Sequence, residues 1–273
     1  MNIRKRDLLE KILIIGSSGE IGSHLYNYLE TRGYSCYGTI RNKNIDKNCI
    51  SSNLIQFNLL EDSNRILSLH EFSWCIIVAS ESSIKYCEEN PIETSIINVE
   101  RIIDLIDKCA GSKISFIYIS SNEVFDGKSQ FRMVNEIPNP ATRYGAQKFL
   151  VEDYIQSNCN DLGVILRITK IISKTTPIIL KWNRSLSNGK KIVAYTDKFI
   201  SPVSIYHVCK VIASIIRQRQ YGLFQLGGAS EISYFDFALQ HYGDYKKIIM
   251  AYSHSSRPFA SLMTYTPTLA EMS

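Results

Sequence analysis

Tyr144 and Lys148 lie four residues apart in the run Tyr-Gly-Ala-Gln-Lys. On a helix, residues at this spacing share a face, so the phenol and the ammonium group can converge. A nearby cation favours the phenolate and lowers the tyrosine pKa from its reference value of about 10. The pair therefore predicts a tyrosine that donates a proton near neutral pH. Because the spacing alone is common in proteins, the surrounding elements decide whether the pair is catalytic.

A second group of reactive side chains lies in residues 119–127, Ile-Ser-Ser-Asn-Glu-Val-Phe-Asp-Gly. This run begins where an apolar strand expected over residues 113–120 ends. The Ser121 hydroxyl at this point can hydrogen-bond a substrate carbonyl and stabilise charge that develops on its oxygen. The alternative is an ordinary serine-rich turn, since Asp126-Gly127 is a frequent turn pair.

Three glycines, Gly16, Gly19 and Gly22, follow the apolar run of residues 12–15. After them, apolar residues recur at helical spacing up to Leu29. Small residues between a buried strand and a helix let the backbone approach a pyrophosphate, which the helix N-terminus attracts. The stretch predicts a dinucleotide-binding turn, and the alternative is a glycine-rich loop without a ligand.

Alternating strands and helices are expected to position these groups. Strands are expected at residues 12–15, 35–40, 54–57, 73–79, 113–120, 163–168, 191–195 and 223–226. Helices are expected at residues 21–29, 63–70, 91–111, 141–156, 177–186, 204–217 and 233–241. This alternation predicts an α/β fold with a doubly wound parallel sheet, whose ligands bind beyond the carboxyl ends of the strands. We expect a short extension (residues 1–10), a nucleotide-binding domain (11–170) and a smaller C-terminal substrate-binding lobe (171–273) interleaved with it.

Composition narrows the function classes. The chain has 273 residues, 45% of them hydrophobic, and a net charge of +5 from scattered basic residues. We therefore expect neither a nucleic-acid nor a membrane partner, and no apolar run reaches the roughly 18 residues of a membrane span. Seven cysteines without a C-x-x-C pair predict reduced thiols in a cytoplasmic protein, with no metal site. The oligomeric state stays open, a homodimer included.

Taken together, the glycine turn, Ser121, Tyr144 and Lys148 resemble an extended short-chain dehydrogenase/reductase with a Rossmann-type sheet. The run of residues 119–127, followed by Asn139-Pro140 and Arg-Tyr-Gly-Ala-Gln-Lys, is similar to the dTDP-4-dehydrorhamnose reductases. The resemblance implies NAD(P)H-dependent reduction of the 4-keto group of a nucleotide-activated 4-keto-6-deoxy sugar. It also implies a role in the biosynthesis of deoxysugars or polysaccharides.

The same resemblance implies roles for single residues. Tyr144 would protonate the keto oxygen, and Ser121 would orient the carbonyl. Lys148 would hold the nicotinamide ribose and lower the tyrosine pKa. The implied cofactor-binding set comprises Gly16, Ser18, Gly19, Glu20, Ile21, Gly22, Arg41, Asn58, Ala79, Ser80, Asn98, Tyr144 and Lys148. For Asn98, a solvated or capping amide is an equal alternative.

The cofactor type can be argued from the end of the second strand, Thr39-Ile-Arg-Asn-Lys43. Sites that prefer NAD usually place an acid here for the ribose hydroxyls, and this stretch has none. Arg41, with Lys43, can pair with the 2′-phosphate of NADP, so NADP(H) is favoured over NAD(H). The alternative is a solvated basic loop. Asn58 stands where relatives often carry an acid toward adenine.

Two other functions remain open from the sequence. One is an epimerase or dehydratase of the same fold, although Asn122 stands where dehydratases carry an acid, and an amide cannot donate a proton as a carboxylic acid does. The other is a non-catalytic, NADP-binding regulatory subunit, for which the reductase-like subunit of methionine adenosyltransferase is a precedent implied by the resemblance. The short C-terminal third leaves the sugar and the nucleotide undefined.

Overall fold

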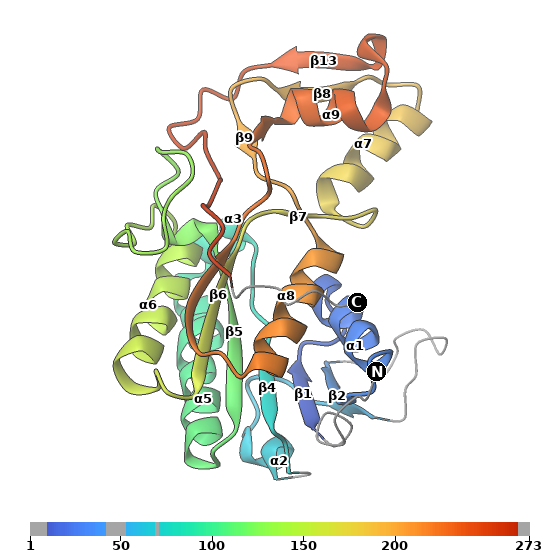
Figure 1. The fold of residues 1–273 in the computed structure, drawn as a ribbon. Coiled ribbons are helices and arrows are strands. Elements are labelled where there is room, and N and C mark those ends of the chain that lie inside the picture. The colour runs from blue at the N-terminus through green and yellow to red at the C-terminus, as the bar shows by residue number, and fades with distance from the viewer. Residues whose placement is uncertain (1–9, 42–52, 69–70, 267–273) are drawn as a thin grey trace.

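A single parallel sheet forms the centre of the protein. The structure, a computed structural model, describes residues 10–41, 53–68 and 71–266. Seven strands pair in parallel in the order β11-β6-β5-β4-β1-β2-β3 (Figure 1). They are β1 (Lys11–Ile15), β2 (Ser35–Ile40), β3 (Leu54–Gln56), β4 (Trp74–Ile77), β5 (Ser115–Ser121), β6 (Gly163–Ile168) and β11 (Gly222–Leu226). The strand order reverses direction between β1 and β4, as in a doubly wound sheet, which confirms the predicted Rossmann-type fold.

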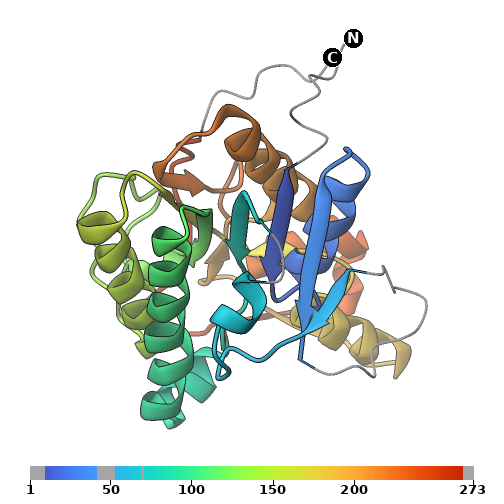
Figure 2. The same cartoon turned by 90° about the horizontal axis from the view of Figure 1, so that it is seen from below.

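Helices cover both faces of this sheet, because the central strands are buried on both sides (Figure 2). Ile12 and Ile14 pack with α1 (Glu20–Glu30) and α8 (Ile205–Gln218) on one face. Leu13 and Ile15 pack with α5 (Arg101–Gly111) and α6 (Arg143–Asn158) on the other. Shorter helices are α2 (Asn64–Leu67), α3 (Ile84–Glu89) and α4 (Pro91–Ser95).

A smaller lobe sits beyond the carboxyl ends of the strands (Figure 1). Its strands β8 (Ile192–Tyr195) and β13 (Ile248–Ala251) pair in parallel against α7 (Pro177–Ser187) and α9 (Tyr234–Tyr242). Trp182, 2% exposed, lies in the core of this lobe. Two-residue strands, β7 (Ile171–Ile172) with β10 (Val203–Ser204) and β9 (Phe199–Ile200) with β12 (Ile232–Ser233), lie between the lobe and the sheet. The boundary near residue 170 stays a prediction, and α8 with β11 returns to the main sheet.

Most expected elements are present, and the differences are local. The helix expected from Pro91 to Gly111 contains a π-helical turn (Ile96–Glu100) between α4 and α5. Helix α3 and strand β13 were not expected, because each is too short to show a clear periodicity. The six cysteines in the described ranges are buried and free. Among the described residues, no helix combines the length and apolar character that crossing a membrane requires.

Candidate functional site

The turn between β1 and α1 is packed too closely for side chains. Gly16 has φ +94°, and a Cβ added there would lie 2.9 Å from the Ala79 nitrogen at the end of β4. A Cβ at Gly22 would lie 2.2 Å from the Gly16 carbonyl oxygen. Thr39 fixes the turn from β2, because its Oγ1 accepts a hydrogen bond from the Gly16 nitrogen at 2.8 Å. The glycines thus bring the N-terminus of α1 against the strand ends.

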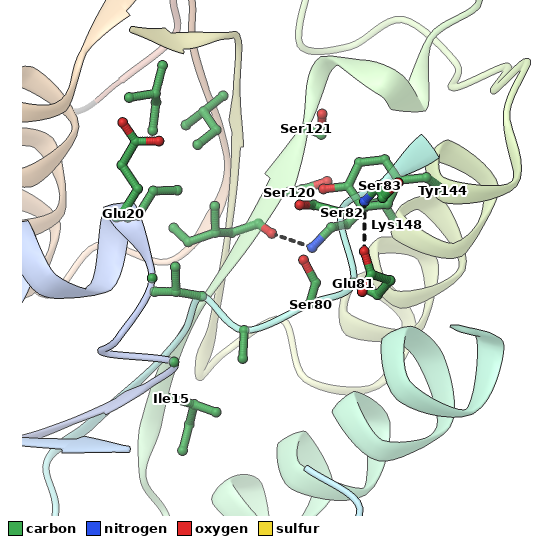
Figure 3. Close-up of a pocket in the computed structure, with 18 of the residues that line it drawn as sticks. Ile15, Glu20, Ser80, Glu81, Ser82, Ser83, Ser120, Ser121, Tyr144 and Lys148 are labelled. Atoms are coloured by element: carbon green, nitrogen blue, oxygen red, sulfur yellow. Dashed lines mark hydrogen bonds between the residues drawn. The ribbon is translucent and has the colours of Figure 1, made fainter. Parts of the chain in front are cut away.

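A cleft of about 840 Å³ opens at this edge of the sheet (Figure 3). Twelve residues of the predicted site line it: Gly16, Ser18, Gly19, Glu20, Ile21, Arg41, Asn58, Ala79, Ser80, Ser121, Tyr144 and Lys148. The glycine turn, the α1 N-terminus and the small side chains of Ala79 and Ser80 form a cradle that fits a dinucleotide. Gly22 and Asn98 are not among the lining residues.

Further polar residues line the cleft that were not expected as site residues. They are Thr39, Glu81, Ser82, Ser83, Ser120, Asn122, Glu123, Thr169, Lys170 and Thr176. Seven of them lie in the segments that follow β4, β5 and β6, and Thr39 and Ser120 lie within β2 and β5. Ligands of a parallel sheet bind beyond the carboxyl ends of its strands. Residues that follow an expected strand could therefore have been predicted as part of the site.

Tyr144 and Lys148 reach the cleft from α6. The Thr142 hydroxyl caps this helix by accepting a hydrogen bond from the Gly145 nitrogen at 3.0 Å. A Cβ at Gly145 would lie 2.0 Å from the Glu123 carbonyl oxygen, so the helix packs directly against the turn after β5. This contact brings the phenol of Tyr144 toward the end of the strand that carries Ser121 (Figure 3).

Lys148 is buried, 3% exposed, and its ammonium group donates a hydrogen bond to the Ile119 carbonyl at 2.9 Å. Its Nζ lies 5.6 Å from the centre of the Tyr144 ring. Burial lowers the pKa of Lys148 from 10.5 to about 8, while the nearby negative charge of Glu152 opposes this decrease. Lys148 therefore remains protonated at neutral pH, with a much smaller margin than an exposed lysine.

The pKa of Tyr144 differs from the sequence expectation. Although part of the side chain is accessible, the protein packed around it raises the pKa above the ordinary value of 10, and a hydrogen bond with Ser80 partly opposes this. Desolvation thus outweighs the expected effect of Lys148 in this structure. Tyr144 is a neutral phenol at neutral pH, which is the form that can donate a proton.

Ser121 ends strand β5 and caps the following 3₁₀ turn (Asn122–Val124). Its hydroxyl oxygen accepts a hydrogen bond from the Glu123 nitrogen at 3.2 Å. The serine oxygen is thereby held at the strand end, where it lines the same cleft as Tyr144. This position suits a hydroxyl that contacts a carbonyl oxygen.

Glu123 is not a free base. Its carboxylate forms an ion pair with Arg257 from the C-terminal segment, and the Arg257 Nε donates to the Asp126 carbonyl at 3.1 Å. The preceding residue, Asn122, has an amide in place of an acid. The two positions therefore lack the acid and the free base that a dehydration would need.

Asn98 does not line the cleft but holds one of the loops that do. It lies in the π-helical turn, 1% exposed, and its Oδ1 accepts a hydrogen bond from the Glu81 nitrogen at 2.8 Å. Its Nδ2 donates to the Glu81 carbonyl at 2.9 Å and to the Gln147 Oε1 at 2.8 Å. Asn98 fixes the loop after β4 that lines the cleft, and a direct contact with a cofactor stays a prediction.

Arg41 and Asn58 line the cleft near the ends of β2 and β3. Asn58 Oδ1 accepts a hydrogen bond from the Leu60 nitrogen at 3.2 Å, so it also stabilises its own turn. Lys43, expected to assist Arg41, lies outside the described residues. Of the two basic residues expected near a 2′-phosphate, Arg41 is the one that the structure describes.

Two known proteins show what the chain is similar to in sequence. The chain is 23% identical over 233 residues to a probable low-salt glycan biosynthesis reductase, Agl14, of Haloferax volcanii. This match covers 82% of this chain and 76% of the relative. It is 31% identical over 162 residues to the beta subunit of methionine adenosyltransferase 2 of Bos taurus. That match covers 58% of this chain and 46% of the relative.

Solved structures show the same fold. A dTDP-4-dehydrorhamnose reductase from Bacillus anthracis in complex with NADP has a TM-score of 0.81 at 18% identity, covering 97% of this chain and 91% of the other. The enzyme of the same name from Yersinia enterocolitica has a TM-score of 0.78 at 23% identity, and the match covers 94% of this chain and 88% of the other. A family model described as RmlD substrate binding domain matches residues 10–261. The chain therefore belongs to the RmlD substrate binding domain family, in agreement with the predicted resemblance.

Proposed function

We propose that this protein is an NAD(P)H-dependent reductase that converts the 4-keto group of a nucleotide-activated 4-keto-6-deoxy sugar to an alcohol. The observation that carries the proposal is that Tyr144, Lys148 and Ser121 line one cleft with the glycine turn. The family, the Haloferax reductase and the fold of the dTDP-4-dehydrorhamnose reductases support the same reaction class. Its product would enter the biosynthesis of deoxysugars or polysaccharides.

The side chains divide the reaction between them. Ser121 hydrogen-bonds the keto oxygen and orients the carbonyl. The neutral phenol of Tyr144 transfers its proton to that oxygen as the carbonyl carbon is reduced. The buried ammonium of Lys148 stabilises the negative charge that remains on the phenolate. The bound cofactor supplies the hydride, and the protein supplies position and the proton.

NADP(H) is the proposed cofactor in preference to NAD(H). Arg41 lines the cleft after β2, and guanidinium groups pair with phosphates through two parallel hydrogen bonds. The sequence from Thr39 to Ile45 offers no carboxylate for a ribose diol. The N–H groups in the first turn of α1, which have no partner within the helix, would hold the pyrophosphate, since the Gly19 N–H already donates to the Gly16 carbonyl at 3.1 Å.

Consumption of NADPH in the presence of a dTDP-4-keto-6-deoxyhexose tests the function. We expect turnover by the wild-type protein and a loss of at least about 100-fold in Tyr144→Phe, which keeps the ring and removes the proton donor. Equal turnover by Tyr144→Phe would contradict the assigned role. An epimerase or dehydratase would instead contain bound NAD and show no net consumption of NADPH.

A regulatory subunit is the second candidate, because the 31% match to a methionine adenosyltransferase beta subunit spans 58% of this chain. This alternative predicts that the protein binds NADPH, reduces no keto-sugar and co-purifies with a larger enzyme. The turnover assay separates it from the reductase, since both candidates bind the cofactor and only one consumes it.

A further inference from the structure

A third ionisable side chain continues the row formed by Tyr144 and Lys148. Glu152 follows Lys148 by four residues on α6, so the three side chains share one face of the helix. Glu152 is 0% exposed and pairs with Arg167 on β6, with 2.7 Å between Glu152 Oε2 and Arg167 Nη2. Arg167 is also buried, at 1% exposed. The row thus runs from the cleft into the interior of the protein.

Glu152 and Lys148 are both anchored to the end of β5. Glu152 accepts a hydrogen bond from the hydroxyl of Ser120, and Lys148 donates to the carbonyl of Ile119. The next residue along this strand is Ser121, the proposed carbonyl-orienting residue. The carboxylate therefore connects the helix that carries Tyr144 to the strand end that carries Ser121.

Stability alone does not account for this buried ion pair. The desolvation cost of two buried charges often equals or exceeds their attraction, and apolar residues of similar volume can replace such pairs without loss of stability. The Arg167 guanidinium is held by further bonds, to Gln225 Oε1 at 3.1 Å and to the Val134 carbonyl at 3.3 Å. The carboxylate is the part of the pair that faces the catalytic lysine along the helix.

We propose that Glu152 is a positioning residue, which holds Lys148 in its ammonium form and fixes the end of β5 through Ser120, with Arg167 as its buried counterion. This inference rests on the proposed function, because it assigns Lys148 a catalytic role. Glu152 is not among the residues that line the cleft, so it acts through Lys148 and Ser120.

The groups packed around Lys148 explain why Glu152 matters. Its neighbours on the same helix are Tyr144 and Glu152. The Tyr118 ring of β5 has its centre 4.6 Å from the Lys148 Nζ, and the Cys87 thiol approaches from α3. Tyr144, Tyr118 and Cys87 all have pKa values raised by burial, so they are neutral near pH 7. Glu152 is therefore the anion among these neighbours, and its charge raises the pKa of Lys148 against the effect of burial.

Glu152→Gln tests the charge while keeping the size and an oxygen acceptor for Ser120. The protonation of Lys148 is measured by competitive acetylation with acetic anhydride across pH, read by mass spectrometry of the peptide that contains it. We expect the midpoint to fall by about one pH unit, and the alkaline limb of kcat to move with it. Glu89→Gln, which removes an exposed carboxylate on α3, is the matched control and should leave the midpoint unchanged.

A second variant keeps the test valid if Glu152→Gln folds poorly with Arg167 unpaired. The double variant Glu152→Met/Arg167→Met removes both charges, and apolar replacement of a buried ion pair is often neutral or stabilising. It should also lower the Lys148 midpoint, because the carboxylate faces Lys148 on the same helix. An unchanged midpoint in whichever variant folds would overturn the proposal. Acetylation requires no substrate, so this outcome is distinct from a failure of the wild-type protein to reduce a keto-sugar.

Discussion

Replacing Lys148 with methionine should abolish activity and make the protein more stable at neutral pH. Lys148 is a buried cation whose pKa is lowered to about 8 from an ordinary 10.5. A difference of this size means that keeping the ammonium group in the folded protein costs about 3 kcal/mol. Methionine has a similar length and carries no charge, so it removes this cost and fills the same space.

Part of the gain is offset by the lost hydrogen bond to the Ile119 carbonyl, worth about 1–2 kcal/mol. The net stabilisation is then about 1–2 kcal/mol, or a rise in Tm of about 2–6 °C for a chain of this size. The pH dependence follows from the sign of the shift. Between about pH 8 and 10.5 the unfolded chain binds the lysine proton more strongly than the folded protein does. The wild type therefore gains up to about 3 kcal/mol as pH rises through this range, which exceeds the advantage of the variant, so the wild type should be the more stable protein near pH 10.

Thermal unfolding of both proteins at pH 7 and at pH 10 measures these effects. Lys85→Met is the control, since the Lys85 side chain is 84% exposed and its removal should leave Tm unchanged within about a degree. A Lys148→Met protein that is less stable than wild type at pH 7, or a difference that does not depend on pH, would refute the reasoning. Activity with NADPH should be lost in Lys148→Met and retained in Lys85→Met.

Two further substitutions test other parts of the cleft. Arg41→Ser should raise the KM for NADPH by about tenfold or more, because a charge-assisted pair with the 2′-phosphate is lost. The KM for NADH should stay unchanged. Equal effects on both cofactors would exclude that pairing. Gly145→Ala places a Cβ 2.0 Å from the Glu123 carbonyl oxygen and should cost about 1–3 kcal/mol, with lower Tm and kcat. Gly111→Ala, where a Cβ meets nothing within 4 Å, is its control and should leave kcat unchanged without lowering Tm.

Local patterns in the sequence were sufficient to predict the sheet and its glycine turn. Strands β2 and β6 match the expected bounds, because apolar runs bounded by turns read directly as buried strands. The turn at Gly16 was predictable because its shape depends on residues that are adjacent in the sequence. Gly16 also packs closely against a distant residue, Ala79. Tyr144 and Lys148 were found because helical spacing places them together.

The remaining features depend on contacts between distant parts of the chain. The ion pair between Glu123 and Arg257 joins residues 134 positions apart, and no spacing rule predicts it. The raised pKa of Tyr144 reflects desolvation by segments that only the folded structure brings together. The same holds for Glu152, which reads in the sequence as an ordinary helical carboxylate and is fully buried against Arg167.

Transfer of deuterium from [4-²H]NADPH tests the central claim most directly, with each of the two C4 stereoisomers of the cofactor used in turn. When purified protein is given a dTDP-4-keto-6-deoxyhexose, we predict a reduced sugar that carries one deuterium at C4 from one stereoisomer and none from the other. Mass spectrometry of the nucleotide sugar reads this result. Binding of NADPH without deuterium in any sugar product, under conditions where both ligands occupy the protein, would contradict the account.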